Sequence, residues 1–315
     1  MSIVNNPIFN DAENAREWLE ALLWPEGPVC PHCGVIGAAY ALRGKAHRAG
    51  LYKCKGCEKQ FTVTVGTLFE RSHIPLNKWL LAFHLMVGSK KGVSAHQIHR
   101  MLDMTYKTAW FMCHRIREAM REGALPAKLG GHNKVVEADE TYIGGKAANR
   151  KGKIPAKEAA FALVERDGAV RTFHVPAVNA KTLRPVLAAH VDRKSYLMTD
   201  DATVYVPMGR DFSGHGAVNH SIEEYVRGGF WHTNTVENYF SILKRGIIGT
   251  YHHVSQQHLK RYLGEFDFRY NMRINLGYDD SARMMLAARG VTGKRLTYRR
   301  ISGSEEASEA GPTGA

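Results

Sequence analysis

Three acidic residues and one lysine have the chemistry and the spacing of a catalytic site. Asp139 and Asp200 lie at the ends of two segments with strand patterns, and Glu237 lies in a later segment with helical spacing. Lys244 follows Glu237 by seven residues, about two helical turns, so both side chains share one face of the predicted helix. We expect Thr235 to cap the start of that helix. The apolar stripe that would dock it on a core consists of Val236, Phe240 and Leu243.

The charge of these acids determines which chemistry they can perform. Carboxylates brought within a few ångströms repel one another by about 4 kcal/mol per pair at an effective dielectric constant of about 20. Mg²⁺ or Mn²⁺ removes that cost, and two ions about 3.5–4 Å apart stabilise the attacking and leaving oxygens of a phosphoryl transfer. The set Asp139, Asp200 and Glu237 therefore predicts a two-metal site, in which Lys244 holds a phosphate of the bound strand.

The motifs around these residues occur in the order of a known family. They are Glu137-Ala-Asp139-Glu-Thr-Tyr-Ile-Gly-Gly-Lys146, Thr199-Asp200, His232-Thr-Asn-Thr-Val-Glu237, Leu243-Lys244-Arg245-Gly246, Gly249-Thr-Tyr-His-His-Val-Ser255 and Tyr262-Leu-Gly-Glu-Phe-Asp-Phe-Arg-Tyr-Asn271. The chain resembles the DDE-type insertion-sequence transposases with an N-terminal zinc ribbon, the ISXO2-like group, from about residue 15 to about residue 275. The resemblance implies a catalytic core of ribonuclease-H-like fold, with Asp139 and Asp200 on strands and Glu237 on a helix.

The resemblance also implies an activity and its partners. A transposase of this kind binds double-stranded DNA at the terminal repeats of its element, nicks it, and joins the freed 3′-hydroxyl to target DNA, usually as a multimer on paired ends. Two alternatives for the ligands stay open. Asp201 adjoins Asp200, and neighbouring strand residues face opposite ways. Some relatives use asparagine as the third ligand, which leaves Asn234 and Asn238 as candidates.

Four of the five cysteines form two pairs. Cys30-Pro-His-Cys33 and Cys54-Lys-Gly-Cys57 are separated by twenty residues, the spacing of a four-thiolate zinc ribbon. In a reducing compartment such pairs bind metal far more often than they form disulfides. We therefore predict a structural zinc ion. We expect Cys113, the fifth cysteine, to lie in a helical core.

The composition fits a nucleic-acid partner. The chain has 43 Lys plus Arg against 30 Asp plus Glu, a formal net charge of +13, and this excess attracts polyanions. The densest basic segment, residues 144–157, directly follows the first acidic strand. The candidate DNA-binding residues are Lys107, Arg115, Lys146, Arg150, Lys151, Lys153 and Arg245.

Residues 75–122 have the pattern of three helices. They begin at Pro75, Ser94 and Thr105, and the last two are good N-caps. A short helix, a tight turn and a basic helix predict a helix-turn-helix, although a helical core without a DNA role has the same pattern. For the third helix we expect Ala109, Met112 and Ile116 inside and Lys107, Arg115, Arg117 and Arg121 outside. We interpret four histidines as surface or hydrogen-bonded core residues, namely His84, His96, His99 and His114.

The predicted organisation is therefore an α/β protein with four parts. They are a zinc ribbon with its N-terminal segment (1–72), a helix-turn-helix module (73–128), a ribonuclease-H-like DDE catalytic domain (129–290) and a disordered tail (291–315). No run of 18 apolar residues occurs and the N-terminus lacks a hydrophobic signal segment, so we expect a cytoplasmic, nucleoid-associated protein without a membrane partner. Two rival functions share these features: a non-catalytic DNA-binding regulator, and a nuclease of the same fold without strand transfer.

Overall fold

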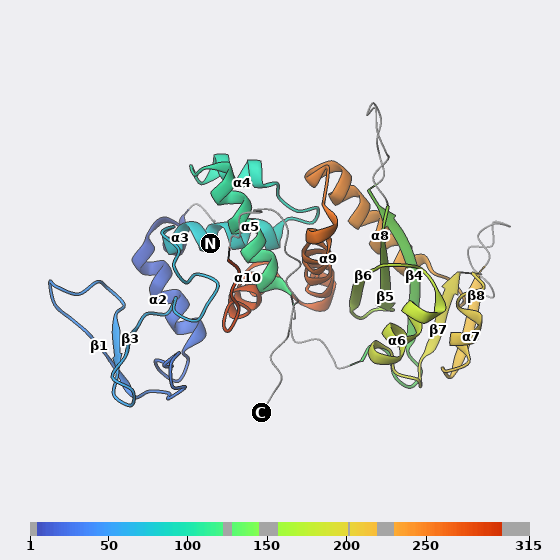
Figure 1. Ribbon diagram of the computed structural model, residues 1–315, viewed down its shortest axis with the longest axis horizontal. Coiled ribbons are helices and arrows are strands. Elements are labelled where there is room, and N and C mark those ends of the chain that lie inside the picture. The colour runs from blue at the N-terminus through green and yellow to red at the C-terminus, as the bar shows by residue number, and fades with distance from the viewer. Residues whose placement is uncertain (1–4, 122–127, 145–156, 201, 219–229, 298–315) are drawn as a thin grey trace, which may run out of the picture.

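The computed structural model describes residues 5–121, 128–144, 157–200, 202–218 and 230–297. Figure 1 shows the small N-terminal strands at one end, a group of helices beside them, and a sheet at the other end. Helix α9 (Gln256–Asn271) stands between the helices and the sheet. The described chain thus runs from a metal-binding ribbon through a helical module to an α/β domain.

The N-terminal ribbon packs on a helix through aromatic side chains. Its strands form an antiparallel sheet in the order β1 (Ala39–Ala41), β2 (Tyr52–Cys54) and β3 (Gln60–Phe61). Two helices precede it, α1 (Pro7–Asn10) and α2 (Ala12–Leu23). The ring of Trp24 lies 5.4 Å from that of Tyr52 and 5.8 Å from that of Phe61, centroid to centroid. The Tyr52 hydroxyl donates to Glu20 on α2 at 3.0 Å, which joins the ribbon to the helices.

The helical module begins where the sequence predicts. Its helices are α3 (Leu76–Gly88), α4 (Ala95–Met101) and α5 (Tyr106–Met120). The side chains of Ser94 and Thr105 accept hydrogen bonds from the amides of Gln97 and Thr108, so both predicted N-caps are confirmed. These caps satisfy amides that have no partner within the helix, and they fix the short turn between α4 and α5.

The C-terminal helix returns to this module. Helix α10 (Asp280–Arg289) packs against α3, and its Met284 and Ala287 belong to the same apolar core as the module's helices. Beyond it, Val291 is fully buried and the amide of Gly293 donates to the carbonyl of Gly66 at 2.9 Å. The prediction of a tail from residue 291 is therefore wrong for residues 291–297, and 298–315 lie outside the described residues. The predicted catalytic domain, which ends at residue 290, also included α10, but this helix belongs to the core of the helical module.

A five-stranded mixed sheet forms the core of the α/β domain. Its strand order is β6-β5-β4-β7-β8, with β4/β5 and β5/β6 antiparallel and β4/β7 and β7/β8 parallel. The strands are β4 (Val135–Ile143), β5 (Glu158–Glu165), β6 (Val170–Val175), β7 (Tyr196–Asp200) and β8 (Gly214–Val218). Sequence analysis missed β8, whose glycines provide no apolar alternation.

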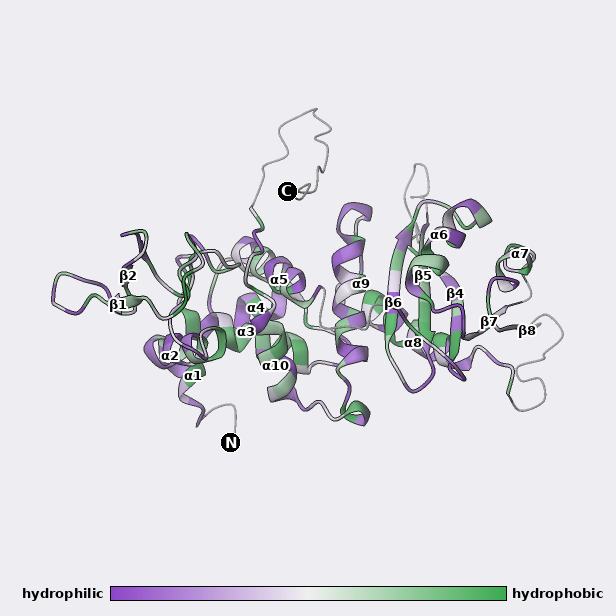
Figure 2. Cartoon of the chain, turned by 90° about the horizontal axis from the view of Figure 1, so that it is seen from below, coloured by the Kyte–Doolittle hydropathy of each residue, from purple (hydrophilic) through white to green (hydrophobic). Residues whose placement is uncertain are grey.

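Helices cover both faces of this sheet. Helices α6 (Ala180–His190) and α7 (Val206–Gly209) pack on one face with Val136 and Leu197. Helices α8 (Asn234–Gly246) and α9 pack on the other face with Ile143 and Ala162. Because it is buried on both faces, β5 is apolar along almost its whole length (Figure 2). Two short helical turns complete the domain, a π-helical turn (Ile247–Tyr251) after α8 and a 3₁₀ turn (Ile274–Leu276) after α9.

A buried ionic cluster joins the helical module to the α/β domain. Glu265 of α9 is fully buried, and it pairs with Arg117 of α5 at 2.7 Å and with Arg269 at 2.5 Å. The Tyr251 hydroxyl donates to the same carboxylate at 2.6 Å. The pKa of Glu265 is lowered by these two arginines and hydrogen bonds, against the opposing effect of burial. The expectation that Arg117 lies on the surface is wrong, because its guanidinium neutralises a carboxylate that has no access to water.

Replacing Glu265 by Gln should destabilise the folded chain by about 3–5 kcal/mol, because it leaves Arg117 and Arg269 charged and buried without a counter-ion. Chemical denaturation of the two variants would measure the difference. The matched control is Glu118→Gln: Glu118 pairs with Arg121 and Arg261 at the edge of the same helices, where exposure limits the cost to about 1 kcal/mol or less. If the two substitutions lowered the free energy of unfolding equally, the Glu265 cluster would not be the main link between the helical module and the α/β domain.

Candidate active site

The register of two parallel strands brings Asp139 and Asp200 together. Glu137 of β4 lies opposite Met198 of β7, and each acid follows two residues further along its own strand. Residues two apart share a face, so both carboxylates lie on the face of the sheet that α8 covers. Neighbouring strands stand about 4.8 Å apart, which places the two acids side by side. Asp201, the alternative ligand, lies outside the described residues.

Helix α8 brings Glu237 and Lys244 to the same place. A cavity of about 610 Å³ beside β4 is lined by Asp139, Glu237, Lys244 and Arg245 among others. Val236, Phe240 and Leu243 are buried beneath α8, as the apolar stripe predicts. The seven-residue spacing therefore does place both polar side chains on the solvent face above the docked stripe. Asn234 and Asn238 are exposed and do not line this cavity.

The carboxylates interact electrostatically. Burial, together with the negative charges of Glu140, Asp200 and Glu237, raises the pKa of Asp139 to about 7. The amide of Glu140 opposes this by donating to Asp139 at 2.7 Å. Glu140 itself faces the opposite side of β4, where the Tyr205 hydroxyl donates to its carboxylate. The fold thus disfavours the negative charge of Asp139 when no cation is beside it.

This donor set fits hard divalent cations. All three candidate ligands offer carboxylate oxygens, which Mg²⁺ and Mn²⁺ prefer, and the raised pKa of Asp139 marks a place where positive charge is lacking. Among the described residues, the four cysteines are the only group of three or more ligand side chains placed closely enough to hold one ion. The three carboxylates do not form such a group in this structure.

The start of α8 differs from the prediction. The helix begins at Asn234 after Thr233, whose side chain makes no capping hydrogen bond, so Thr235 is not the N-cap. The cap comes instead from Glu137 of β4. Its Oε2 accepts hydrogen bonds from the amides of Thr235 at 2.8 Å and Val236 at 3.0 Å, and its Oε1 accepts one from the Thr235 hydroxyl at 2.9 Å.

Arg166 completes the surroundings of this carboxylate. Its Nε donates to Glu137 Oε1 at 2.6 Å, and its terminal nitrogens donate to the carbonyls of Phe230 and His232 at 2.9 Å each. His232 Nδ1 also lies 3.2 Å from Glu137 Oε1. The guanidinium thereby ties the segment that leads into α8 to the same buried acid.

Sequence reasoning included Glu137 in a motif but gave it no role. A signal was present, because Glu137 stands two residues before Asp139 on a strand of mainly apolar residues and therefore shares its face. A buried carboxylate requires partners. Arg166, which lies 29 positions later at the end of β5, could not have been identified without the strand pairing.

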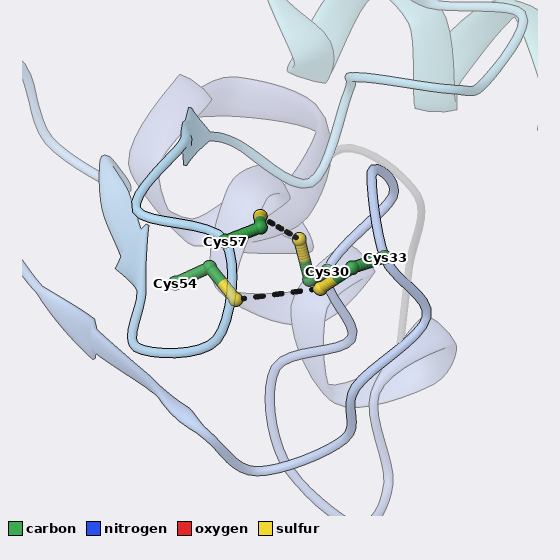
Figure 3. A group of neighbouring side chains, drawn as sticks. All are labelled: Cys30, Cys33, Cys54 and Cys57. Carbon is green, nitrogen blue, oxygen red and sulfur yellow. Dashed lines mark hydrogen bonds between the residues drawn. The ribbon is translucent and has the colours of Figure 1, made fainter.

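The four paired cysteines converge as predicted. The Sγ atoms of Cys30 and Cys57 lie 3.6 Å apart, as do those of Cys33 and Cys54 (Figure 3). All four sulfur atoms lie within 4.8 Å of one another, and Zn–S bonds of about 2.3 Å in a tetrahedron require separations of about 3.8 Å. Hydrogen bonds from the amides of Cys57 and Gly56 lower the pKa of Cys54 to about 7, which favours the thiolate that zinc binds.

The predicted DNA-binding residues have different surroundings. Lys107 and Arg245 are exposed. Arg115 is partly buried, and its guanidinium donates to the carbonyls of Leu68 and Leu296 at 2.8 and 3.2 Å, so it connects backbone segments of the module. The remaining four lie outside the described residues, namely Lys146, Arg150, Lys151 and Lys153.

Two predictions about buried residues of α5 had different outcomes. Cys113 is fully buried in the helical core, as expected. His114 is buried too, but neither of its ring nitrogens has a hydrogen-bond partner among the described residues, which contradicts the expectation of a hydrogen-bonded core histidine. Burial lowers its pKa to about 2, so the ring stays neutral against Trp110 and His258, at centroid distances of 4.2 and 4.6 Å.

Comparisons with known proteins match both the N-terminal ribbon and the α/β domain. The ISXO2-like transposase domain matches residues 128–271, and the transposase zinc-ribbon domain matches residues 10–60. The chain is 28% identical to an uncharacterised protein in transposable element ISH50 of Halobacterium salinarum, over 83% of this chain and 91% of that protein. A chain of the simian T-cell lymphotropic virus intasome in complex with PP2A regulatory subunit B56 gamma aligns with a TM-score of 0.28 and 14% identity, over 54% of this chain and 67% of that chain.

These matches define the class of protein as a transposase with a zinc ribbon. Residues 128–271 match an ISXO2-like transposase domain and residues 10–60 match a transposase zinc ribbon, the same domains that the motifs of the chain resemble. The described helices include none that is both long enough and apolar enough to cross a bilayer.

Removing zinc should unfold the ribbon and leave the α/β domain folded, because a three-stranded module of this size has a small core of its own. We expect Cys54→Ser to lose the zinc ion and to become sensitive to proteolysis within residues 10–60. Zinc content by mass spectrometry and limited proteolysis would test this. Cys113→Ser is the matched control, since it alters a buried thiol far from the four sulfur atoms. Full zinc content in the Cys54 variant would contradict the four-thiolate site.

Proposed function

We propose that this transposase nicks DNA at the terminal repeats of its element and joins the freed 3′-hydroxyl to target DNA at one two-metal site. Asp139, Asp200 and Glu237 are the proposed ligands, on a core of ribonuclease-H-like fold. The observation that carries the proposal is the shared cavity: Asp139 from β4 and Glu237 from α8 face the same space, and the strand register places Asp200 beside Asp139.

The carboxylates and Lys244 have different proposed roles in the reaction. Two divalent cations, when bound, would supply the positive charge that activates the attacking oxygen and stabilises the leaving one. The three carboxylates hold this charge in place. Lys244 lines the same cavity and is exposed, so it can contact a phosphate of the strand under attack. Asp139 must lose its proton to act as a ligand, and a cation beside it would favour that loss.

A second cavity extends the path for DNA. It measures about 720 Å³, shares Lys244 and Ile248 with the first cavity, and is also lined by Lys157 and Tyr142. Tyr142 is 52% exposed, which leaves its ring available to the bound strand. Cations and an exposed aromatic ring are the groups that hold single-stranded nucleic acid. We propose that the strand end runs from the acids past Lys244 into this space.

The N-terminal parts would recognise the repeats. The short turn between helices α4 and α5 supports the proposal of a helix-turn-helix, a motif in which the start of the second helix contacts base edges. At that start Tyr106 is 43% exposed and stacks on His96 at 4.1 Å, and Lys107 is exposed beside it. We propose that this surface and the zinc ribbon bind the repeats, and that two or more copies act on paired ends.

Replacing Asp139 by Asn or Glu237 by Gln should abolish strand cleavage, by at least about a hundredfold, and leave binding to the repeats within about twofold. Each change removes a ligand charge and preserves shape. The assay uses labelled DNA with the element's own terminal repeats, with Mg²⁺ present or absent, and follows binding, nicking and joining separately.

Asp211→Asn is the control, because that carboxylate pairs with Arg184 beside helices α6 and α7. Normal cleavage by either ligand variant would refute the site. Binding without any metal-dependent nicking in the wild-type protein would indicate a regulator, and nicking without joined products would indicate a nuclease.

Replacing Lys244 by Ala should lower strand joining about tenfold, because one charge-assisted contact to phosphate is worth about 1.5 kcal/mol or more. The Mg²⁺ concentration at half-maximal rate should stay unchanged. Lys260→Ala is the matched control, since it removes the same charge from an exposed position of α9 outside this cavity. A raised Mg²⁺ requirement in the Lys244 variant would show instead that Lys244 supports the ligands.

A further inference from the structure

We propose that Glu137 is the positioning residue that sets the distance between the carboxylates of Asp139 and Glu237, and that Arg166 assists it. This inference rests on the proposed function. Glu137 is fully buried, yet the reaction assigned to the site gives it no part. Its contacts join the strand that carries the first acid to the helix that carries the third.

The connection between the two acids is short. Asp139 lies two residues after Glu137 on β4 and on the same face. On the other side, Glu137 accepts a hydrogen bond from the amide of Val236, and Glu237 is the next residue. A shift of the Glu137 carboxylate relative to α8 therefore moves Glu237 relative to Asp139 by a similar amount.

The N-cap side chain of α8 does not cap its own helix, since the Thr233 hydroxyl donates to Glu237 Oε1 at 3.4 Å instead. Helix N-termini expose amides that a side chain of the N-cap residue normally satisfies. Here the Thr233 side chain makes no such bond, and Glu137 satisfies the amides of Thr235 and Val236 from another strand. The negative charge also stabilises the positive end of the helix dipole. Without Glu137, the turn that carries Glu237 would fray.

Glu137 is not itself a fourth ligand. Its Oε2 accepts two backbone hydrogen bonds, and its Oε1 accepts from the Thr235 hydroxyl and from Arg166. A carboxylate with both oxygens engaged in this way has no free direction for a metal ion. Arg166 also balances its charge, so the buried acid does not add to the repulsion among the ligands.

Glu137→Gln tests the proposal, because glutamine has the same size but lacks the negative charge that stabilises the start of α8. Its side-chain nitrogen also cannot accept the hydrogen bond from Arg166. Two measurements on the zinc-loaded full chain are needed. Hydrogen exchange at residues 235–237 should accelerate at least tenfold. The Mn²⁺ dissociation constant, from thermal stabilisation during a Mn²⁺ titration, should rise about tenfold.

Glu165→Gln is the matched control. Glu165 is also a buried strand glutamate that accepts from a backbone amide, that of Gly130, and pairs with Lys134, but none of its recorded partners lies on α8. Glu165→Gln should change the overall stability. It should leave hydrogen exchange at residues 235–237 and the Mn²⁺ dissociation constant within twofold of the wild-type values. An equal effect of the two substitutions would overturn the proposal, because Glu137 would then act through general stability.

A double-mutant cycle separates positioning from other roles. If Glu137 acts through Glu237, Glu137→Gln should not weaken Mn²⁺ binding further in a Glu237→Gln background. An undiminished second effect would overturn the proposal. Arg166→Lys provides a milder test should Glu137→Gln fold poorly, since it keeps the charge and drops contacts to Phe230 and His232. Its hydrogen exchange at residues 235–237 should accelerate, and unchanged exchange would overturn the proposal.

The outcomes also distinguish this inference from the proposed function. If the wild-type protein neither binds Mn²⁺ nor cuts DNA, the proposed function fails, and hydrogen exchange still decides whether Glu137 holds the start of α8. If the wild-type protein binds Mn²⁺ and cuts while Glu137→Gln matches it in exchange and affinity, only the positioning role is wrong.

Discussion

A carboxylate without exposed surface must find hydrogen-bond donors inside the protein, and Glu137 finds them at the start of α8. This constraint fixes how the helix meets the sheet. The apolar stripe of α8 determines which face docks, but apolar contacts alone tolerate small sliding movements. Hydrogen bonds to two successive amides do not, because their geometry is directional. The polar face of α8, with Glu237 and Lys244, takes its position from that anchor.

The far end of α8 depends on a second buried glutamate. The π-helical turn after α8 ends at Tyr251, whose hydroxyl donates to Glu265 of α9. Glu265 also neutralises Arg117 of the helical module, so one carboxylate contacts three elements. Since breaking a buried charge pair is costly, the module and the α/β domain are held as neighbours through α9. The contacts of Glu265 therefore connect α5 to the end of the helix that carries Glu237.

Much of this arrangement could be predicted from periodicity and caps. Ser94 and Thr105 begin helices because their hydroxyls satisfy free amides, and that signal is local. The cysteine spacing likewise predicted the four-sulfur cluster, since zinc imposes its own geometry. What failed depended on distant partners. Arg117 looks like a surface cation until Glu265 of a later helix is placed beside it.

The same limit applies to the start of α8. Thr235 is a good cap by its type, but an acid 98 positions earlier occupies the amides that a cap would satisfy. Strand β8 was missed because glycines provide no apolar pattern, although pairing with β7 stabilises it. Helix α10 was assigned to the wrong core, because the chain crosses the α/β domain before it returns to the helical module. In each case the deciding contact is long-range and leaves no local trace.

Charge connects the site to the rest of the chain. The protein carries a net charge of +13, yet in the proposed function Asp139, Asp200 and Glu237 lie where a DNA phosphate would arrive. Phosphate and carboxylates repel each other, so the strand can approach only if positive charge lies between them. Lys244 and Arg245 provide part of it from the rim, and divalent cations would provide the rest. Cation binding and DNA binding at this site must then strengthen each other by the same factor, because the coupling between two ligands is reciprocal. In the proposed function, an acid cluster that is unfavourable alone would thus make the site selective for the state in which DNA and cations are both present.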